Sequence, residues 1–195
     1  MKRPIIVELS GLPNSGKTTF MQRLITICEE KSVNAEFIQE SAELLPLFIK
    51  KGSLDQNLWI TLETLQRCTE IRSSNTTLII VDRGFYNQLF WATLYKEKNP
   101  EYSKTILNLM NSLSKIFPIK PDYLYVIDVD VQESLKRRMA SGEPITFSKE
   151  SFLINYKTRF AEFYESIEPK FYLDTTNLSK DEVANIVFSK LTTLL

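Results

Sequence analysis

The stretch Gly11-Leu12-Pro13-Asn14-Ser15-Gly16-Lys17-Thr18 decides the fold, because its two glycines are separated by four residues and followed at once by lysine and threonine. This is the P-loop pattern, in which glycines let the backbone turn its N–H groups inward around phosphates. The apolar run Ile5–Leu9 before it and the amphipathic stretch 17–30 after it supply the strand and helix that the motif requires. The loop therefore predicts a site for a nucleoside triphosphate, taken to be ATP, together with Mg²⁺.

The side chains in and after this loop have separate predicted tasks. Lys17 is expected to reach the β- and γ-phosphates and to act in catalysis, and the Thr18 hydroxyl is expected to ligate Mg²⁺. The N-terminus of the following helix adds partial positive charge. The residues predicted to bind the nucleotide here are Gly11, Pro13, Asn14, Ser15, Gly16, Lys17, Thr18 and Thr19.

Short apolar runs alternate with longer amphipathic stretches along the rest of the chain. Nearly continuous apolar runs are typical of strands buried on both faces of a parallel sheet. The alternation predicts an α/β fold, a three-layer doubly wound parallel sheet of five strands, as one domain over residues 1–195. The predicted strands are Ile5–Leu9, Val33–Ile38, Leu78–Val81, Tyr123–Ile127 and Phe171–Leu173, and the predicted helices are 17–30, 55–74, 85–97, 102–116, 131–141, 148–166 and 180–193, the last opened by a capping box of Ser179 and Glu182.

The composition excludes several classes of function. Lysine plus arginine equals aspartate plus glutamate at 24 each, which argues against a general nucleic-acid or membrane-surface binder. The chain has no histidine, so catalysis by histidine and metal ligation by histidine are excluded. Its two cysteines, Cys28 and Cys68, are too few for a zinc motif and fit buried thiols in a reducing cytoplasm. No apolar run approaches the ~20 residues of a membrane span. The sequence does not decide whether the chain forms a homodimer.

Charged residues follow two further predicted strands, at the edge where a doubly wound sheet binds its ligand. Asp82 ends the third strand at the position of a Walker B acid, where it can hold Mg²⁺, and Arg83 beside it can reach a phosphoryl group. Glu40 follows the second strand and can act as a general base toward an acceptor hydroxyl. The alternatives are that Asp82 caps the next helix and that Glu40 caps the segment after it or stays solvated.

A basic cluster ends the predicted helix 131–141. Arg137 and Arg138, with the glycine and proline that follow, predict a small helical lid over about residues 136–150 whose arginines neutralise charge during phosphoryl transfer. The alternative is a favourable contact between basic side chains and the helix C-terminus. Thr175 follows the fifth strand, and it is predicted either to border the base of the nucleotide or to cap a plain turn.

With these residues in place, the chain resembles the nucleoside and nucleotide kinase branch of P-loop proteins, with thymidylate kinases and deoxynucleoside kinases the most similar in layout. The resemblance rests on the P-loop at 11–18, the acid Glu40, the Asp82-Arg83 pair, the basic segment near 136–144 and the closing Asp174-Thr175-Thr176. It implies strand order 2-3-1-4-5, with Glu40 and Arg83 facing the acceptor and Asp82 near the metal.

The sequence departs from both relatives at the acceptor end. Thymidylate kinases typically carry Arg-Glu-Pro after the second strand, where this chain has Gln39-Glu40-Ser41. Deoxynucleoside kinases usually carry Glu-Arg-Ser after the third, where this chain has Asp82-Arg83-Gly84. The missing arginine would grip the phosphate of a nucleoside monophosphate, so the resemblance does not identify the acceptor.

Three hypotheses of function follow. The first is a kinase that transfers the γ-phosphoryl group of ATP to a small acceptor, a nucleoside or nucleotide before others. The second is a nucleotide-dependent switch that hydrolyses ATP slowly, although the guanine motif Asn-Lys-x-Asp of GTPases does not occur. The third is a kinase for another small molecule. Aromatic residues in 85–95 can stack on a planar acceptor, but their spacing also suits the buried face of a helix.

Overall fold

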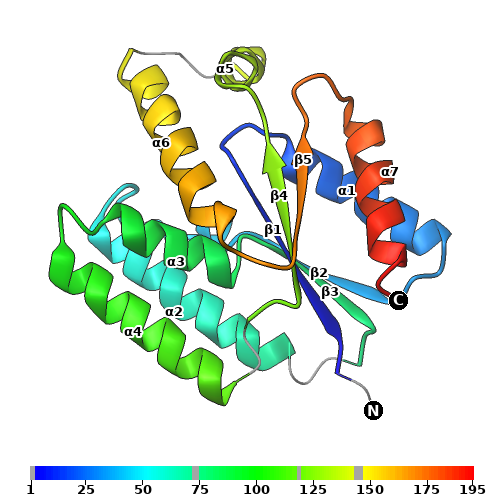
Figure 1. The fold of residues 1–195 in the computed structure, drawn as a ribbon, viewed down its shortest axis with the longest axis horizontal. Helices are drawn as coiled ribbons and strands as arrows, with labels where there is room; N and C mark the ends of the chain where they lie inside the picture. Colours follow the sequence, from blue (N-terminus) through cyan, green and yellow to red (C-terminus); the bar gives the residue numbers. More distant parts are fainter. Residues whose placement is uncertain (1–2, 72–74, 118–119, 143–146) are drawn as a thin grey trace. The chain divides into compact units, whose positions relative to one another are not determined.

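The computed structural model describes residues 3–71, 75–117, 120–142 and 147–195, and within them five strands form one sheet (Figure 1). The sheet is parallel, with strand order β2-β3-β1-β4-β5, which confirms the predicted fold class. The strands are β1 Ile5–Gly11, β2 Ala35–Ile38, β3 Leu78–Asp82, β4 Tyr123–Asp128 and β5 Lys170–Asp174. The helices are α1 Lys17–Glu30, the 3₁₀ turn η1 Ser41–Leu44, α2 Leu54–Ile71, α3 Phe85–Leu94, α4 Pro100–Ile116, α5 Val131–Ala140, α6 Phe147–Glu165 and α7 Lys180–Thr192.

Several element boundaries differ from the sequence prediction for local reasons. Strand β2 begins at Ala35 rather than Val33, because the Val33 N–H donates to the Cys28 carbonyl and still belongs to the end of α1. Helix α4 begins earlier than predicted, with Pro100 in its first turn, where the missing N–H costs nothing. The capping box of Ser179 and Glu182 at the start of α7 is confirmed. Residues 72–74 of the predicted 55–74 helix and 143–146 of the predicted lid lie outside the described residues.

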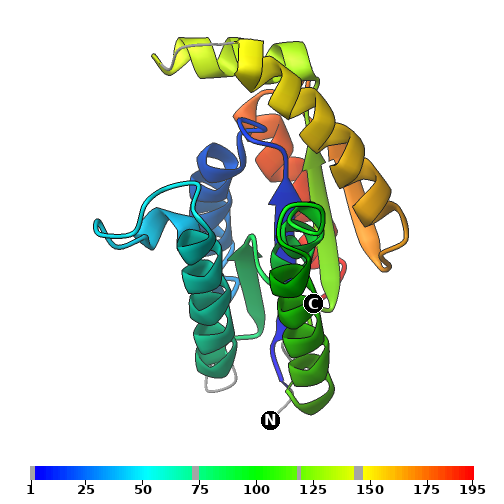
Figure 2. The same ribbon diagram turned by 90° about the vertical axis from the view of Figure 1, so that its left-hand side faces the viewer.

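The chain divides into two compact units, and the first comprises Met1–Glu8 and Ala35–Asp122. Strands β2 and β3 pair in parallel here, with Ile38 opposite Val81, and Leu78, Ile79 and Ile80 are buried. Helices α2, α3 and α4 lie side by side (Figures 1 and 2). The segment between β2 and α2 contains η1, which packs against α2.

The second unit comprises Leu9–Asn34 and Tyr123–Leu195. Strands β4 and β5 pair in parallel from Leu124 opposite Lys170 to Asp128 opposite Asp174. Helices α1 and α7 pack against each other, and α5 contacts α6 (Figure 1). This unit holds the P-loop together with both turns that follow β4 and β5, so the contacts of that loop can be followed within it.

Two smaller expectations also have an outcome. Cys28 is buried, and burial raises the pKa of its thiol, so it behaves as a structural side chain. The side chain of Cys68 lies outside the described residues. Within the described part of the chain, none of the helices has the length and apolar character needed to cross a membrane.

Candidate active site

The P-loop connects β1 to α1 with a backbone conformation that few sequences tolerate. Asn14 and Gly16 both adopt positive φ, at 56° and 85°. A Cβ atom at Gly11 would lie 2.2 Å from the Ile127 carbonyl oxygen, so glycine is required for the close approach to β4. Gly16 is the N-cap of α1 and offers no side-chain cap, which leaves the helix N-terminus suited to an anion.

Polar side chains gather inside this loop. The buried Lys17 ammonium donates to the carbonyl oxygens of Gly11 and Leu12, both at 3.2 Å. Asn14 Nδ2 and Ser15 Oγ are buried with no hydrogen-bond partner among the described residues. Thr18 and Thr19, by contrast, are exposed at the start of α1. Buried polar atoms without partners are costly, and a bound phosphate would satisfy them.

Residues from α5 and from the turn after β5 hold the outer side of the loop. Ser134 Oγ donates to the Pro13 carbonyl at 2.9 Å. Arg137 donates to the carbonyl oxygens of Ser15 at 3.3 Å and of Thr175 at 2.7 Å. Side chains of α5 therefore hold the Pro13 and Ser15 carbonyls of the loop.

The structure shows which groups Arg137 and Thr175 contact, which the sequence did not predict. Thr175 is 1% exposed, and its hydroxyl lies 2.8 Å from the Asp128 carbonyl and 3.3 Å from the Ser15 carbonyl. Arg137 also pairs with Glu133 at 3.1 Å, which together with the neighbouring lysine lowers the pKa of that carboxyl. Arg138 is half-buried beside it. Both Arg137 and Thr175 therefore support the P-loop directly.

The other predicted residues lie in the first unit, around the turn between β3 and α3. Asp82 is buried at the end of β3, and Arg83 follows with a positive φ of 56°, a strained conformation for a residue with a side chain. Gly84, two residues after Asp82, occupies the N-cap of α3. Arg83 forms an ion pair of 2.5 Å with Glu40, and the two side chains are only 16% and 17% exposed.

Glu8 is a further residue of this region, and the sequence did not predict a role for it. It lies inside β1, is 1% exposed, and accepts hydrogen bonds of 2.8 Å from the backbone N–H groups of Tyr86 and Asn87. Its carboxylate therefore caps α3 from a different strand and favours the positive end of that helix. The available signal was an acid in the middle of an otherwise apolar strand.

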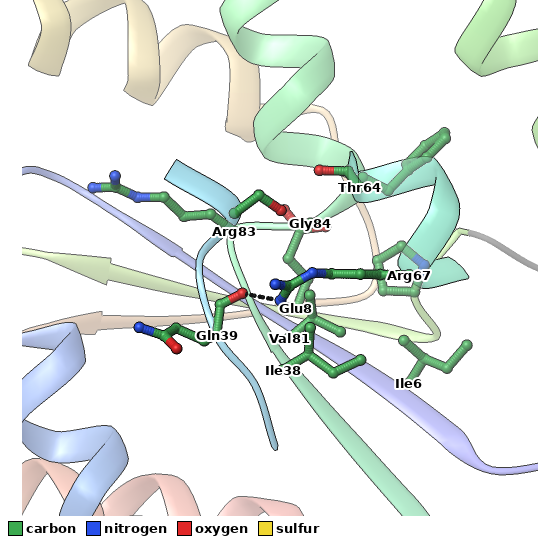
Figure 3. A pocket seen from close by; sticks show the side chains of 12 residues that line it. Ile6, Glu8, Ile38, Gln39, Thr64, Arg67, Val81, Arg83 and Gly84 are labelled. Atoms are coloured by element: carbon green, nitrogen blue, oxygen red, sulfur yellow. Dashed lines mark hydrogen bonds between the residues drawn. The ribbon is translucent and has the colours of Figure 1, made fainter. Parts of the chain in front are cut away.

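Two residues of α2 fix the backbone on both sides of Glu40. Arg67 Nη1 donates to the Gln39 carbonyl at 2.5 Å, as Figure 3 shows. Glu63 accepts from Ser41 Oγ at 2.5 Å and from Arg67 Nε at 2.6 Å. Glu40 itself makes no capping bond to η1, so the capping alternative is wrong for it. Arg67, Gln39 and Glu8 line a small, largely apolar cavity of about 20 Å³.

A second and larger cavity opens between η1, α2 and α3, with a volume of about 250 Å³. We call it the α2–α3 pocket; its walls carry Glu40 and Arg83, four amide side chains (Gln56, Asn57, Asn87 and Gln88) and the aromatic residues Trp91 and Tyr95. The aromatic residues of 85–95 divide between the core and this pocket. Phe85, Tyr86 and Phe90 are buried in the core, whereas Trp91 and Tyr95 face the pocket.

Comparison with known proteins identifies the family. Residues 60–187, more than half of the chain, match the family model described as thymidylate kinase. The chain belongs to the thymidylate kinase family. The matched region contains Asp82, Arg83 and Arg137 but begins after the P-loop, so the loop is independent support for the same assignment.

Solved structures of this thymidylate kinase family and of related kinases share the fold. A thymidylate kinase from Candida albicans is 18% identical with a TM-score of 0.70, over 98% of this chain and 92% of that one. A deoxyadenosine kinase from M. mycoides, solved with dCMP and dCDP, is 15% identical with a TM-score of 0.71, over 97% of this chain and 100% of that one. The same enzyme solved with dATP is 17% identical with a TM-score of 0.69, over 96% of this chain and 100% of that one. A search of curated proteins gave no significant match.

Membership in the thymidylate kinase family makes the chain a P-loop phosphotransferase of the nucleoside and nucleotide kinase type. Proteins of this kind commonly use Mg²⁺ held by few protein ligands and by the phosphates themselves. Among the described residues, no group of three or more cysteine, aspartate or glutamate side chains is placed so that it could hold a metal ion. The exposed Thr18 hydroxyl and the Asp82 carboxylate are hard oxygen donors of the type that Mg²⁺ prefers.

Proposed function

We propose that this protein is a Mg²⁺-dependent kinase that transfers the γ-phosphoryl group of ATP to a nucleoside or nucleotide acceptor. The observation that carries the proposal is the P-loop. Its carbonyls at Pro13 and Ser15 accept hydrogen bonds from α5, while Asn14 Nδ2 and Ser15 Oγ are buried without a hydrogen-bond partner among the described residues. A loop of this kind is prepared for an anion.

The donor phosphates would bind along the loop and the N-terminus of α1. Lys17 would exchange its two carbonyl acceptors, Gly11 and Leu12, for oxygens of the β- and γ-phosphates, a more favourable charge-assisted contact. Arg137 keeps the Ser15 carbonyl turned outward and, with Arg138, adds positive charge near the transferred group. Thr175 would act through the loop, because its hydroxyl is directed to backbone carbonyls.

Thr18 and Asp82 would hold Mg²⁺, one by its hydroxyl and the other by its carboxylate. The metal, when bound, neutralises charge on the phosphate oxygens. Asp82 is suited to this task because it ends β3 and its side chain is buried. Its burial fixes the carboxylate in place without a large entropy cost on binding.

At the acceptor, Glu40 would take the proton of the attacking hydroxyl, and Arg83 would orient that group. Their ion pair holds the Glu40 carboxylate in place at the wall of the α2–α3 pocket. The strained conformation of Arg83 is consistent with a residue held for function.

ADP release in the presence of Mg²⁺ tests the proposal. The purified chain is incubated with ATP and a panel of nucleosides and nucleotides, and turnover is measured with and without each compound. We expect at least one compound to stimulate ADP release well above the basal rate and to appear phosphorylated by mass spectrometry. ATP binding with slow hydrolysis that no compound stimulates would contradict a kinase and favour the nucleotide-dependent switch.

A further inference from the structure

The charge of the α2–α3 pocket is balanced. Of the described residues that line it, Glu40 and Arg83 alone are charged, and they are paired at 2.5 Å with both side chains more than four-fifths shielded from solvent. The positive charge of Arg83 is therefore offset by the adjacent carboxylate. A ligand that brought a phosphate dianion next to this pair would meet the Glu40 carboxylate as well as the guanidinium.

The other polar groups of the pocket are neutral amides. Asn87 is 3% exposed, and its Oδ1 has no hydrogen-bond partner among the described residues. Asn57 donates to Tyr95 Oη at 2.6 Å, which fixes both side chains at the pocket wall. Amides supply donors and acceptors in one plane, and the rings of Trp91 and Tyr95 supply flat apolar faces.

We infer that the acceptor is an unphosphorylated nucleoside, not a nucleoside monophosphate. This inference rests on the proposed kinase function and narrows it. A planar heterocycle matches the amide and aromatic wall, where the Asn87 oxygen can accept a hydrogen bond from a ring N–H or amino group. A sugar hydroxyl matches Glu40, because it is neutral and can donate to the carboxylate.

The reaction balances with these groups. The acceptor O–H bond breaks and its proton passes to Glu40, while the oxygen forms a bond to the γ-phosphorus of ATP. The bond between that phosphorus and the β–γ bridging oxygen breaks, and ADP leaves with the electron pair. The products are ADP and a nucleoside monophosphate, and Glu40 returns its proton to solvent.

The first test compares each common nucleoside and deoxynucleoside with its own 5′-monophosphate, using ATP, Mg²⁺ and the full chain. We expect kcat/KM to favour the best nucleoside over its monophosphate by at least about 100-fold, since placing like charges together is strongly unfavourable. Equal rates or a preference for the monophosphate would overturn this inference and leave the kinase function standing. Stimulation by neither panel would overturn the proposed function with it.

Two variants test the residues that carry the argument. Glu40→Gln removes the carboxylate and leaves Arg83 without its opposing charge, so we expect slower nucleoside phosphorylation and an affinity for the monophosphate raised at least about tenfold in calorimetry. Asn87→Leu should raise KM for the nucleoside about tenfold with kcat little changed. Asn111→Leu, an exposed amide on α4, is the matched control and should change neither constant.

Unchanged monophosphate affinity in Glu40→Gln, or unchanged KM in Asn87→Leu, would count against the inference. Thermal unfolding of each variant beside Asn111→Leu separates a lost contact from a damaged fold. The backbone N–H of Asn87 keeps its bond to Glu8 in the Leu variant, so α3 should remain capped.

Discussion

The P-loop of the second unit and the α2–α3 pocket of the first bind by different means. The P-loop pattern binds phosphates through backbone N–H groups, and here Ser134 and Arg137 hold two of the loop's carbonyls. The pocket presents side chains, among them Asn87 and Trp91, on helices whose backbone groups are already used. Backbone recognition needs glycines at fixed positions and so leaves a motif, whereas side-chain recognition varies with the ligand and leaves none.

This difference explains why the sequence predicted the nucleotide-binding loop but did not predict how the acceptor is recognised. Every triphosphate offers the same oxygens, so one loop geometry serves them all. An acceptor is recognised by its own shape and hydrogen-bonding pattern, and the charge balance at Glu40 and Arg83 becomes visible only when the ion pair is seen. Variants that affect one end and spare the other test how separate the two are.

The largest effect is expected from Lys17→Ala in the P-loop. Loss of the ammonium should lower kcat by about 1,000-fold or more, because its charge acts on the transferred phosphoryl group. The fold should persist, since the bonds from Lys17 to the Gly11 and Leu12 carbonyls lie within the loop. Turnover, ATP affinity and thermal unfolding are measured together. Turnover near that of the unmodified protein would refute the assigned role of the loop.

An intermediate effect is expected from Arg67→Met on α2, which tests the acceptor end. Removing the bonds from Arg67 to Gln39 and Glu63 should let the segment around Glu40 shift and lower kcat by about 10- to 100-fold. ATP affinity should stay unchanged, because this positioning residue has no part in the P-loop. Gln66→Met, an exposed neighbour on the same helix, is the control. An equal loss of ATP affinity would show general damage instead of mispositioning.

The sequence predicted what depends on residues close together in the chain. The P-loop, the strand–helix alternation and the capping box at Ser179 are all of this kind, and the strand order came through the resemblance to nucleotide kinases. It did not predict the contacts of Glu8 with α3 or of Glu63 with Ser41, which join residues 78 and 22 positions apart. Such contacts follow from packing, for which one sequence holds no periodic signal. The boundary errors at β2 and α4 arose from hydrogen bonds at helix ends.

The smallest effect is expected from Glu8→Gln, which tests how the N-terminus of α3 is held beside the α2–α3 pocket. The amide keeps the size of the carboxylate but loses its charge and one acceptor at the N-terminus of α3. The free energy of unfolding should therefore fall by about 1 kcal/mol in denaturant titrations. Glu36→Gln, an exposed acid on β2, is the matched control and should be nearly neutral.

Kinetics of the same Glu8→Gln variant then separate stability from function. Because Glu8 anchors the first turn of α3, which also carries Asn87, a small rise in the acceptor KM should accompany the lost stability. The KM for ATP should stay constant, since the P-loop proposed to bind the phosphates belongs to the other unit. A rise in the ATP constant as large as that for the acceptor would mean that the two ends share their support, and the division drawn between loop and pocket would fail.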